Sequence, residues 1–274
     1  MIIPYHVDVA MDRVPFTNWI LITFTCVYTI VMWGVESKRT DIEIDPIIFQ
    51  TTDPRKRDQA LDELERKLVE PPPPLSSLQR KHFALYQLVT HIFVHNDIWH
   101  LGGNMLALFI FGNAINGKLG HLSFVGLYLV FGISAGLCWL VLGQGEAALG
   151  ASGAIMGICG MFLVLYPKND VSVFWTFFVR GGTFEIASYW LLLFWFAGDL
   201  WGCFGTGGGI AYVAHLGGAL AGFAVGIFLV VNDWVESPAG EENLLQALGL
   251  RESSERWDWK GQRRVRKKGH RKPG

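Results

Sequence analysis

Two side chains in this sequence have the chemistry and the surroundings of a nucleophile and its base. Ser152 lies in Gly150-Ala151-Ser152-Gly153-Ala154, which opens an uncharged hydrophobic stretch, and His215 lies in a second such stretch. A serine becomes a strong nucleophile when a base takes its proton and nearby donors stabilise the oxyanion. Ionisable residues inside an apolar span are costly and mark function by default. The pair therefore predicts acyl transfer, with Ser152 as nucleophile and His215 as base.

Glycines at helical spacing follow both residues. They are Gly218, Gly222 and Gly226 after His215, and Gly153, Gly157 and Gly160 after Ser152. Small residues on one face of a helix let a second helix approach closely. We therefore expect these two helices to pack together and to bring the serine hydroxyl within hydrogen-bonding distance of the imidazole. Gly150 and Gly153 also allow a tight turn and leave room for a substrate backbone.

His100 and Asn104 lie one helical turn apart at the start of another apolar stretch. On a helix, side chains at this spacing point the same way. These two neutral donors could complete an oxyanion site with the unpaired backbone N–H groups of the helix N-terminus at Ser152. The alternative is that both side chains make hydrogen bonds between helices.

Three histidines, His91, His95 and His100, lie close together in this part of the chain. A metal site is disfavoured, because Asp97 is the only acid at metal-ligand spacing and the H-E-x-x-H motif is absent. We instead expect His91, His95 and Asn96 to line a water path to the serine. No metal or organic cofactor is implied.

Asp199 is the only acid well inside a predicted span. It could orient a histidine base, as the acid of a Ser-His-Asp triad does. Its place near the end of the span favours a structural or gating role, since water or a helix-end contact can satisfy a carboxylate there. The glycine-rich segment Gly205–Gly209 follows, and we expect it to act as a cap or gate over the site.

The elements that must hold these residues are predicted from the hydrophobicity of the chain. Of its 274 residues, 51% are hydrophobic and 17% are charged, which is too apolar for an ordinary soluble domain. Uncharged runs long enough to cross a bilayer occur at Phe16–Gly34, Ile98–Ile115, Leu122–Leu142, Gly150–Tyr166, Ile186–Phe204 and Ile210–Val231. The apolar run Val171–Val179 is too short to span and is expected at the membrane interface. The predicted fold class is therefore an all-α membrane protein, a bundle of six transmembrane helices.

The charge distribution predicts the orientation of the chain. Of the 23 Lys and Arg residues, ten lie between Arg251 and Lys272. An excess of these residues marks the cytoplasmic side. We therefore expect a multi-pass protein of the bacterial inner membrane, with both termini in the cytoplasm and with Ser152 and His215 towards the outer face. The expected divisions are an N-terminal segment 1–15, a first span 16–34, a long first loop 35–97, a core of five spans 98–233 and a basic tail 234–274.

The long first loop is the least membrane-like region of the chain. Asp58–Glu70 predicts a short helix with Leu61, Leu64 and Leu68 along one stripe. This helix is either solvated with a small apolar seam or a contact for a partner or a membrane surface. Pro71–Pro74 ends it and predicts a stiff spacer.

Taken together, the motifs resemble the rhomboid family of intramembrane serine proteases. The resemblance covers roughly residues 82–233, and its most specific parts are His95…His100-x-x-x-Asn104, Gly150-Ala151-Ser152-Gly153 and Ala214-His215-x-x-Gly218-x-x-x-Gly222. It implies a Ser152–His215 dyad with no third acid, which leaves Asp199 outside the catalytic set. It also implies an oxyanion hole formed by the Ser152 N–H, His100 and Asn104. Substrates would be single-span membrane proteins, with the fifth helix and the loop over the site as their gate.

Three positions depart from well-known bacterial members of that family. Tyr86-Gln87 stands where a Trp-Arg pair is often found, and Asn116 stands where a glutamate is common. Met156 occupies the position of an aromatic residue that often stacks on the catalytic histidine. The first two positions concern scaffold stability or lipid contact, and the third concerns the orientation of His215.

Two other functions fit a chain with several spans. One is a catalytically silent rhomboid-like protein that binds membrane clients, but such relatives usually lack the serine or the histidine, and both are present here. The other is a channel or transporter, which needs polar residues along a whole pore, whereas here they gather towards one face. We therefore expect a serine endopeptidase that acts on single-span transmembrane proteins in a lipid membrane, with no nucleic-acid partner.

Overall fold

The computed structural model describes residues 2–40, 53–69, 74–177, 180–205, 211–235, 237, 241–251, 255–257 and 263–265. The helices are α1 (Phe16–Thr40), α3 (Pro54–Val69), α4 (Gln87–Thr90), α5 (Ile98–Ala107), α6 (Asn113–Leu119), α7 (His121–Leu142), α8 (Ser152–Leu165), α9 (Ser188–Gly202), α10 (Tyr212–Val231) and α11 (Leu244–Ala247), with a 3-10 turn η1 (His91–Phe93) and a π-helical segment η2 (Leu108–Gly112). The strands are β1 (Ile2–Val7), β2 (Leu78–Gln79), β3 (Ala147–Ala148), β4 (Asp170–Phe177), β5 (Arg180–Ala187), β6 (Glu255–Trp257) and β7 (Arg263–Val265). The chain is therefore mostly helical, as expected.

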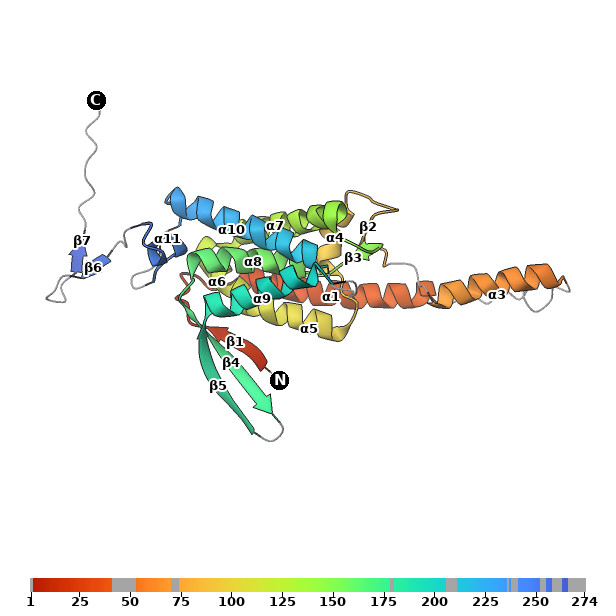
Figure 1. The fold of residues 1–274 in the computed structure, drawn as a ribbon, viewed down its shortest axis with the longest axis horizontal. Coiled ribbons are helices and arrows are strands. Elements are labelled where there is room, and N and C mark those ends of the chain that lie inside the picture. The colour runs from red at the N-terminus through yellow and green to blue at the C-terminus, as the bar shows by residue number, and fades with distance from the viewer. Residues whose placement is uncertain are drawn as a thin grey trace, which may run out of the picture.

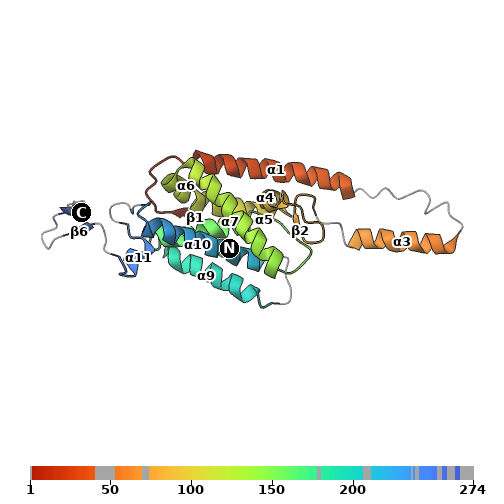
Figure 2. The same ribbon diagram turned by 90° about the horizontal axis from the view of Figure 1, so that it is seen from above.

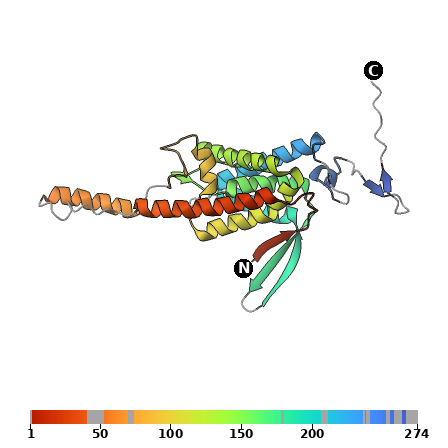
Figure 3. The same cartoon turned by 180° about the vertical axis from the view of Figure 1, so that it is seen from behind.

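Four helical segments in the described part of the chain are long and apolar enough to cross a membrane: Phe16–Ser37, Ile98–Leu119, His121–Leu142 and Tyr212–Val231. The second of these runs without a break through α5, η2 and α6. Figure 1 shows the long helices lying side by side as one elongated bundle, and Figure 3 shows α1 along its opposite face. The predicted spans at these four places are confirmed as helices.

The remaining two predicted spans form shorter helices, α8 of 14 residues and α9 of 15 residues. At 1.5 Å per residue, α8 is about 21 Å long, which is less than the hydrocarbon thickness of about 30 Å. Every residue of α8 from Gly153 to Leu165 is buried, and the helix lies in the middle of the bundle (Figure 1). A helix enclosed by protein on all sides need not match the full lipid thickness.

Helices α8 and α10 pack at very short range along their glycines. A Cβ atom added to Gly218 would lie 1.9 Å from the carbonyl oxygen of Gly153, and one added to Gly222 would lie 1.7 Å from that of Gly157. Any side chain at either position would push the helices apart. This close packing is the arrangement that the glycine spacing predicts.

A three-stranded antiparallel sheet, in the order β1-β4-β5, corrects the expectation of an all-α fold. The run expected at the membrane interface, Val171–Val179, lies largely in β4, which pairs with β5 from Asp170↔Ala187 to Phe177↔Arg180. β1 pairs with the other edge of β4. The cause is the alternation in β4, where Val171 and Val173 are buried and their neighbours Asp170, Ser172 and Phe174 are more exposed. Alternation of this kind is typical of a strand with one buried face.

The N-terminal and C-terminal segments meet at one end of the bundle, just beyond the last turn of α8. Lys168 forms an ion pair with Glu242 at 2.7 Å. The side-chain amide of Asn169 donates to the carbonyl of Asp8 at 2.7 Å. Ser152 begins α8 and therefore lies at its other end. In all three views α3 extends beyond the bundle on the side opposite α11 (Figures 1, 2 and 3).

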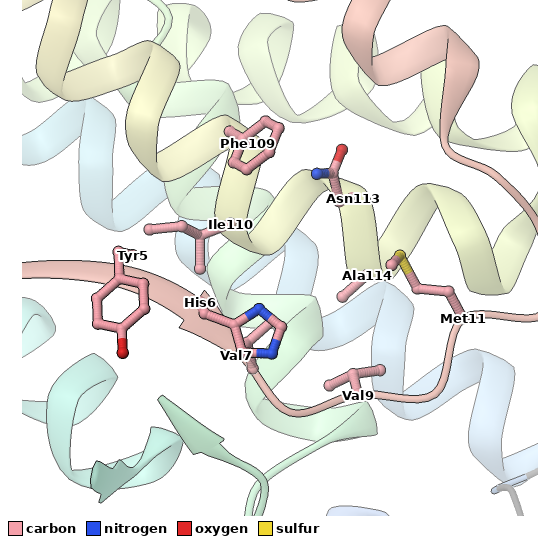
Figure 4. A pocket seen from close by; sticks show the side chains of 9 residues that line it. All are labelled: Tyr5, His6, Val7, Val9, Met11, Phe109, Ile110, Asn113 and Ala114. Atoms are coloured by element: carbon pink, nitrogen blue, oxygen red, sulfur yellow. The ribbon is translucent and has the colours of Figure 1, made fainter. Parts of the chain in front are cut away.

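β1 and the segment that follows it lie against η2 and the start of α6. Side chains of the N-terminal segment and of the η2–α6 segment line a hollow between them, among them Tyr5, His6, Phe109 and Asn113 (Figure 4). Ser152 lies at the far end of α8, so this hollow is separate from the predicted site.

Helix α3 confirms the expected helix of the first loop, with bounds Pro54–Val69 in place of Asp58–Glu70.

Candidate active site

Ser152 and His215 meet across the α8–α10 contact. The hydroxyl Oγ of Ser152 lies 2.8 Å from Nε2 of His215, which is hydrogen-bonding distance. Ser152 is the first residue of α8, and His215 lies in the first turn of α10. The glycine contacts set this distance, because Gly218 lies one turn below His215 and meets Gly153, the residue after the serine. The arrangement allows the imidazole to accept the serine proton.

The turn before Ser152 has a shape that only glycine adopts readily. Gly150 has φ +116°, and an added Cβ there would lie 2.8 Å from the His100 ring. The N–H of Gly150 donates to the carbonyl of His91 at 2.8 Å. The next N–H, that of Ala151, donates to Nε2 of His95 at 3.3 Å. The segment after α4 therefore fixes the turn that presents the serine.

His95 is held in one tautomer by its partners. Because Nε2 accepts from Ala151, the ring hydrogen lies on Nδ1 and donates to Oγ1 of Thr29 at 3.2 Å. The Thr29 hydroxyl in turn donates to the carbonyl of Phe93 at 2.8 Å. Burial lowers the pKa of His95 to about 3 and that of His91 to about 4. Both rings are therefore neutral near pH 7. Each makes a hydrogen bond with a backbone group, His95 with the N–H of Ala151 and His91 with the carbonyl of Gln87.

These contacts bear on the expected water path. His91 and His95 are 6% and 1% exposed, and Nδ1 of His91 lies 2.7 Å from the carbonyl of Gln87. Asn96 is exposed. The two rings are thus engaged with backbone groups, and a path for water along this segment stays a prediction. In the described part of the chain, no group of three or more His, Cys, Asp and Glu residues is placed to hold a metal ion.

His100 and Asn104 lie on α5 beside the Gly150 turn. An added Cβ at Gly150 would lie 2.8 Å from the His100 ring and 3.8 Å from Nδ2 of Asn104. Asn104 is buried, and its Nδ2 has no hydrogen-bond partner within the described residues. Asp97 caps α5 by accepting from the N–H groups of Trp99 and His100. The Gly150 turn thus has an unused, buried hydrogen-bond donor beside it.

Asp199 is placed differently from the expectation. Its Oδ1 lies 3.0 Å from Nδ1 of His215, and the two side chains are 12% and 15% exposed. We expected water or a helix-end contact to satisfy this carboxylate, and the structure brings it to the imidazole instead. The sequence singled out Asp199 as the only acid well inside a predicted span. It favoured a structural or gating role for this residue and did not predict the contact with His215.

A model of the Rhomboid domain matches residues 82–232 of the chain, the stretch that contains Ser152, His215 and Asp199. The chain belongs to the rhomboid family. It is 34% identical to the mitochondrial Rhomboid protein 1 of Saccharomyces cerevisiae over 151 residues, which are 52% of this chain and 41% of the yeast protein. It is 35% identical to the chloroplastic Rhomboid-like protein 11 of Arabidopsis thaliana over 88 residues, 32% of this chain and 31% of the plant protein.

A third rhomboid relative, RHOMBOID-like protein 1 of Arabidopsis thaliana, is 28% identical over 157 residues, 57% of this chain and 37% of that protein. The match therefore spans less than half of the length of each of these relatives. The Rhomboid domain and the apolar helices identify an integral membrane protein. The relatives are yeast and plant proteins, so the comparisons do not support the expected bacterial inner membrane.

The three departures from bacterial rhomboids have distinct surroundings. Gln87 is buried, and its Oε1 accepts from the N–H groups of Gln79 and Ala84, at 3.3 and 3.2 Å. Asn116 is fully buried and accepts from the N–H of Asn18 at 3.2 Å. Both residues thus contribute to the scaffold.

At the histidine itself, Met156 is buried one turn after Ser152. The aromatic neighbour of the His215 ring is Tyr212, which lies edge-on at 6.5 Å between ring centroids. An effect of Met156 on the orientation of the imidazole stays a prediction.

Proposed function

We propose that this rhomboid is an intramembrane serine endopeptidase that cleaves membrane proteins in or near their transmembrane segments. The observation that carries the proposal is the distance of 2.8 Å between Oγ of Ser152 and Nε2 of His215. A silent, client-binding relative does not need this pair of groups. The family match supports the same class of reaction.

The proposed reaction is acyl transfer. His215 accepts the proton of Ser152 while the hydroxyl oxygen attacks the peptide carbonyl. The imidazolium then protonates the leaving amine, and an ester with Ser152 remains. Water, deprotonated by His215, attacks this ester and releases the second product with the serine restored. The chemistry requires no metal or organic cofactor.

The oxyanion of each tetrahedral intermediate forms beside the Gly150 turn. We assign its donors to the N–H of Ser152, the side-chain amide of Asn104 and the ring of His100. The unused Nδ2 of Asn104 supports this assignment. The N–H of Ser152 is in the first turn of α8, where backbone donors have no partner within the helix.

We propose six membrane spans, formed by α1, the α5–α6 segment, α7, α8, α9 and α10. With six spans both termini lie on the same side, and the charge distribution favours the cytoplasmic side. The contacts of Lys168 and Asn169 with the two terminal segments support this arrangement. Ser152 then lies towards the other face of the membrane, where water has the shorter path to it.

We propose single-span transmembrane proteins as substrates, which enter past α9. This helix exposes large apolar side chains, among them Trp190, Phe194 and Trp201 at 60%, 76% and 84%. A helix with such a surface is suited to contact lipid or the apolar helix of a substrate. Part of the loop expected to cap the site, Gly205–Gly209, lies outside the described residues.

Cleavage of a model single-span substrate by the purified protein in detergent tests the proposal. Ser152→Ala removes the nucleophile, and we expect no cleavage above the uncatalysed rate. Ser123→Ala is the matched control, because Ser123 is exposed at the start of α7; its activity should equal that of the unaltered protein. Cleavage by Ser152→Ala at the normal rate would show that another residue is the nucleophile.

A further inference from the structure

Asp199 gives the site a third member beyond the serine and the histidine. Its Oδ1 lies 3.0 Å from Nδ1 of His215, while Nε2 of the same ring lies 2.8 Å from Oγ of Ser152. The carboxylate and the imidazole are both largely shielded from water. The three side chains come from α8, α9 and α10, so three separate elements converge on one chain of hydrogen bonds.

The partners of the imidazole determine where its hydrogen lies. A carboxylate only accepts hydrogen bonds, so the ring hydrogen of neutral His215 must lie on Nδ1. Nε2 then carries the free lone pair, which faces the Ser152 hydroxyl. This is the tautomer that a general base for Ser152 requires. The other tautomer would turn Nε2–H towards the serine and leave the base without a lone pair for the proton.

The position of Asp199 is fixed by the packing of α9 on α10. The backbone carbonyl of Asp199 accepts from the N–H of Cys203 at 3.0 Å, so Asp199 is held in the last helical turn of α9. One turn further on, Gly202 lies against Tyr212, and an added Cβ there would come within 2.6 Å of the tyrosine ring. The end of α9 thus rests on the first turn of α10. The carboxylate is left to pair with His215.

We propose that Asp199 is a positioning residue in the proposed proteolysis. It holds His215 in the tautomer with the hydrogen on Nδ1, and it stabilises the imidazolium that forms when Ser152 gives up its proton. The site therefore operates as a Ser-His-Asp triad. This inference rests on the proposed function and extends it, because a dyad of serine and histidine does not require the acid.

The isosteric variant Asp199→Asn tests the role. It keeps the shape but replaces the charged acceptor by a neutral amide, so it weakens both the choice of tautomer and the stabilisation of the imidazolium. We expect kcat for a model single-span substrate to fall by about 10- to 100-fold, with KM unchanged. This is the change in rate that corresponds to replacing a hydrogen bond to a charged group by one to a neutral group. Asp199→Glu keeps the charge and should recover part of the loss. Glu185→Gln, which removes one exposed acid on β5, is the control for charge and should leave kcat unchanged.

Two further measurements separate positioning from other roles of Asp199. The rate at which a fluorophosphonate labels Ser152 depends on the base but not on the entry of a helical substrate, and it should fall with kcat. The ¹⁵N spectrum of His215, assigned by its loss in His215→Ala, should show the hydrogen on Nδ1 in the unaltered protein and a mixture of tautomers in Asp199→Asn. This spectrum gives a result even if a variant is poorly active. Melting temperatures in detergent show whether each variant folds.

The outcomes distinguish this inference from the proposed function. If the unaltered protein is labelled and a folded Asp199→Asn variant reacts equally fast, the positioning role is overturned and the protease assignment stands. A rise in turnover of Asp199→Asn, or a fall in KM, also overturns it, since the contact would then act as a latch between α9 and α10. If the unaltered protein is neither labelled nor active, the proposed function fails, and the triad fails with it.

Discussion

The packing of α10 on α8 sets the geometry of the site, so one methyl group at Gly218 should be enough to inactivate it. A Cβ at this position would lie 1.9 Å from the carbonyl oxygen of Gly153. Carbon and oxygen atoms that are not bonded stay more than 3 Å apart, so the helices must separate locally by about 1 Å. A separation of this size takes the Oγ–Nε2 distance between Ser152 and His215 from 2.8 Å past the limit beyond which no hydrogen bond forms.

A misplacement of this size lowers the rate of a catalysed reaction by roughly 100-fold, or about 2.7 kcal/mol of transition-state stabilisation. We therefore expect Gly218→Ala to reduce kcat/KM by about that factor. The overpacked core should also lose about 1 to 3 kcal/mol of stability. Initial rates of substrate cleavage, taken well below the melting temperature of the variant, separate the two effects.

Gly126→Ala provides the control for Gly218→Ala. Gly126 lies on α7, and an added Cβ there meets no atom within 4 Å. Alanine also favours the helix more than glycine does, so this variant should keep full activity and at least the original melting temperature. Normal turnover by Gly218→Ala, with Gly126→Ala also normal, would refute the claim that the glycine contact holds the serine and the imidazole together.

Three further predictions concern the scaffold around the site. Gly150→Ala must adopt φ +116° and approach the ring of its neighbour on α5, so we expect a loss of about 1 to 3 kcal/mol, seen as a lower melting temperature. His91 and His95 have pKa values lowered by burial to about 4 and about 3. The unfolded chain therefore binds more protons between those values and about pH 6.5, and stability should fall as pH falls through this window, by up to about 1.4 kcal/mol per pH unit for each histidine. Denaturation in detergent between pH 7.5 and 5 measures this slope, and an unchanged midpoint would contradict it. Asn18→Ala removes the donor to a carbonyl of η2 and should cost about 1 to 3 kcal/mol. Thr23→Ala, which loses only an exposed bond within α1, should change the midpoint little.

Much of the fold and the centre of the site could be predicted from the sequence, because their signals are local. Long uncharged runs predicted the four long helices, and the helical spacing of glycines predicted the contact of α8 with α10. Ser152 and His215 stand out for the same reason, since the serine lies among glycines at the start of an uncharged run and an ionisable residue inside an apolar span is rare. These features depend on neighbouring residues along one helix.

The features that the sequence did not predict depend on contacts between distant segments. β1 forms a strand because an edge of β4 is available to pair with it, and no alternation in the mixed N-terminal segment indicates this. Asp199 was noticed as an unusual acid, but its pairing with His215 depends on how α9 is rotated against α10. That rotation is set by contacts such as Gly202 on Tyr212, which have no periodic pattern.

The most direct test of the central claim is to map a fluorophosphonate adduct on the purified protein by mass spectrometry. The reagent phosphonylates a serine only where a base and oxyanion donors activate it. We predict one adduct, on the peptide that contains Ser152, and its loss in His215→Ala. An adduct elsewhere, or labelling of Ser152 at the same rate without the imidazole, would contradict the catalytic pair.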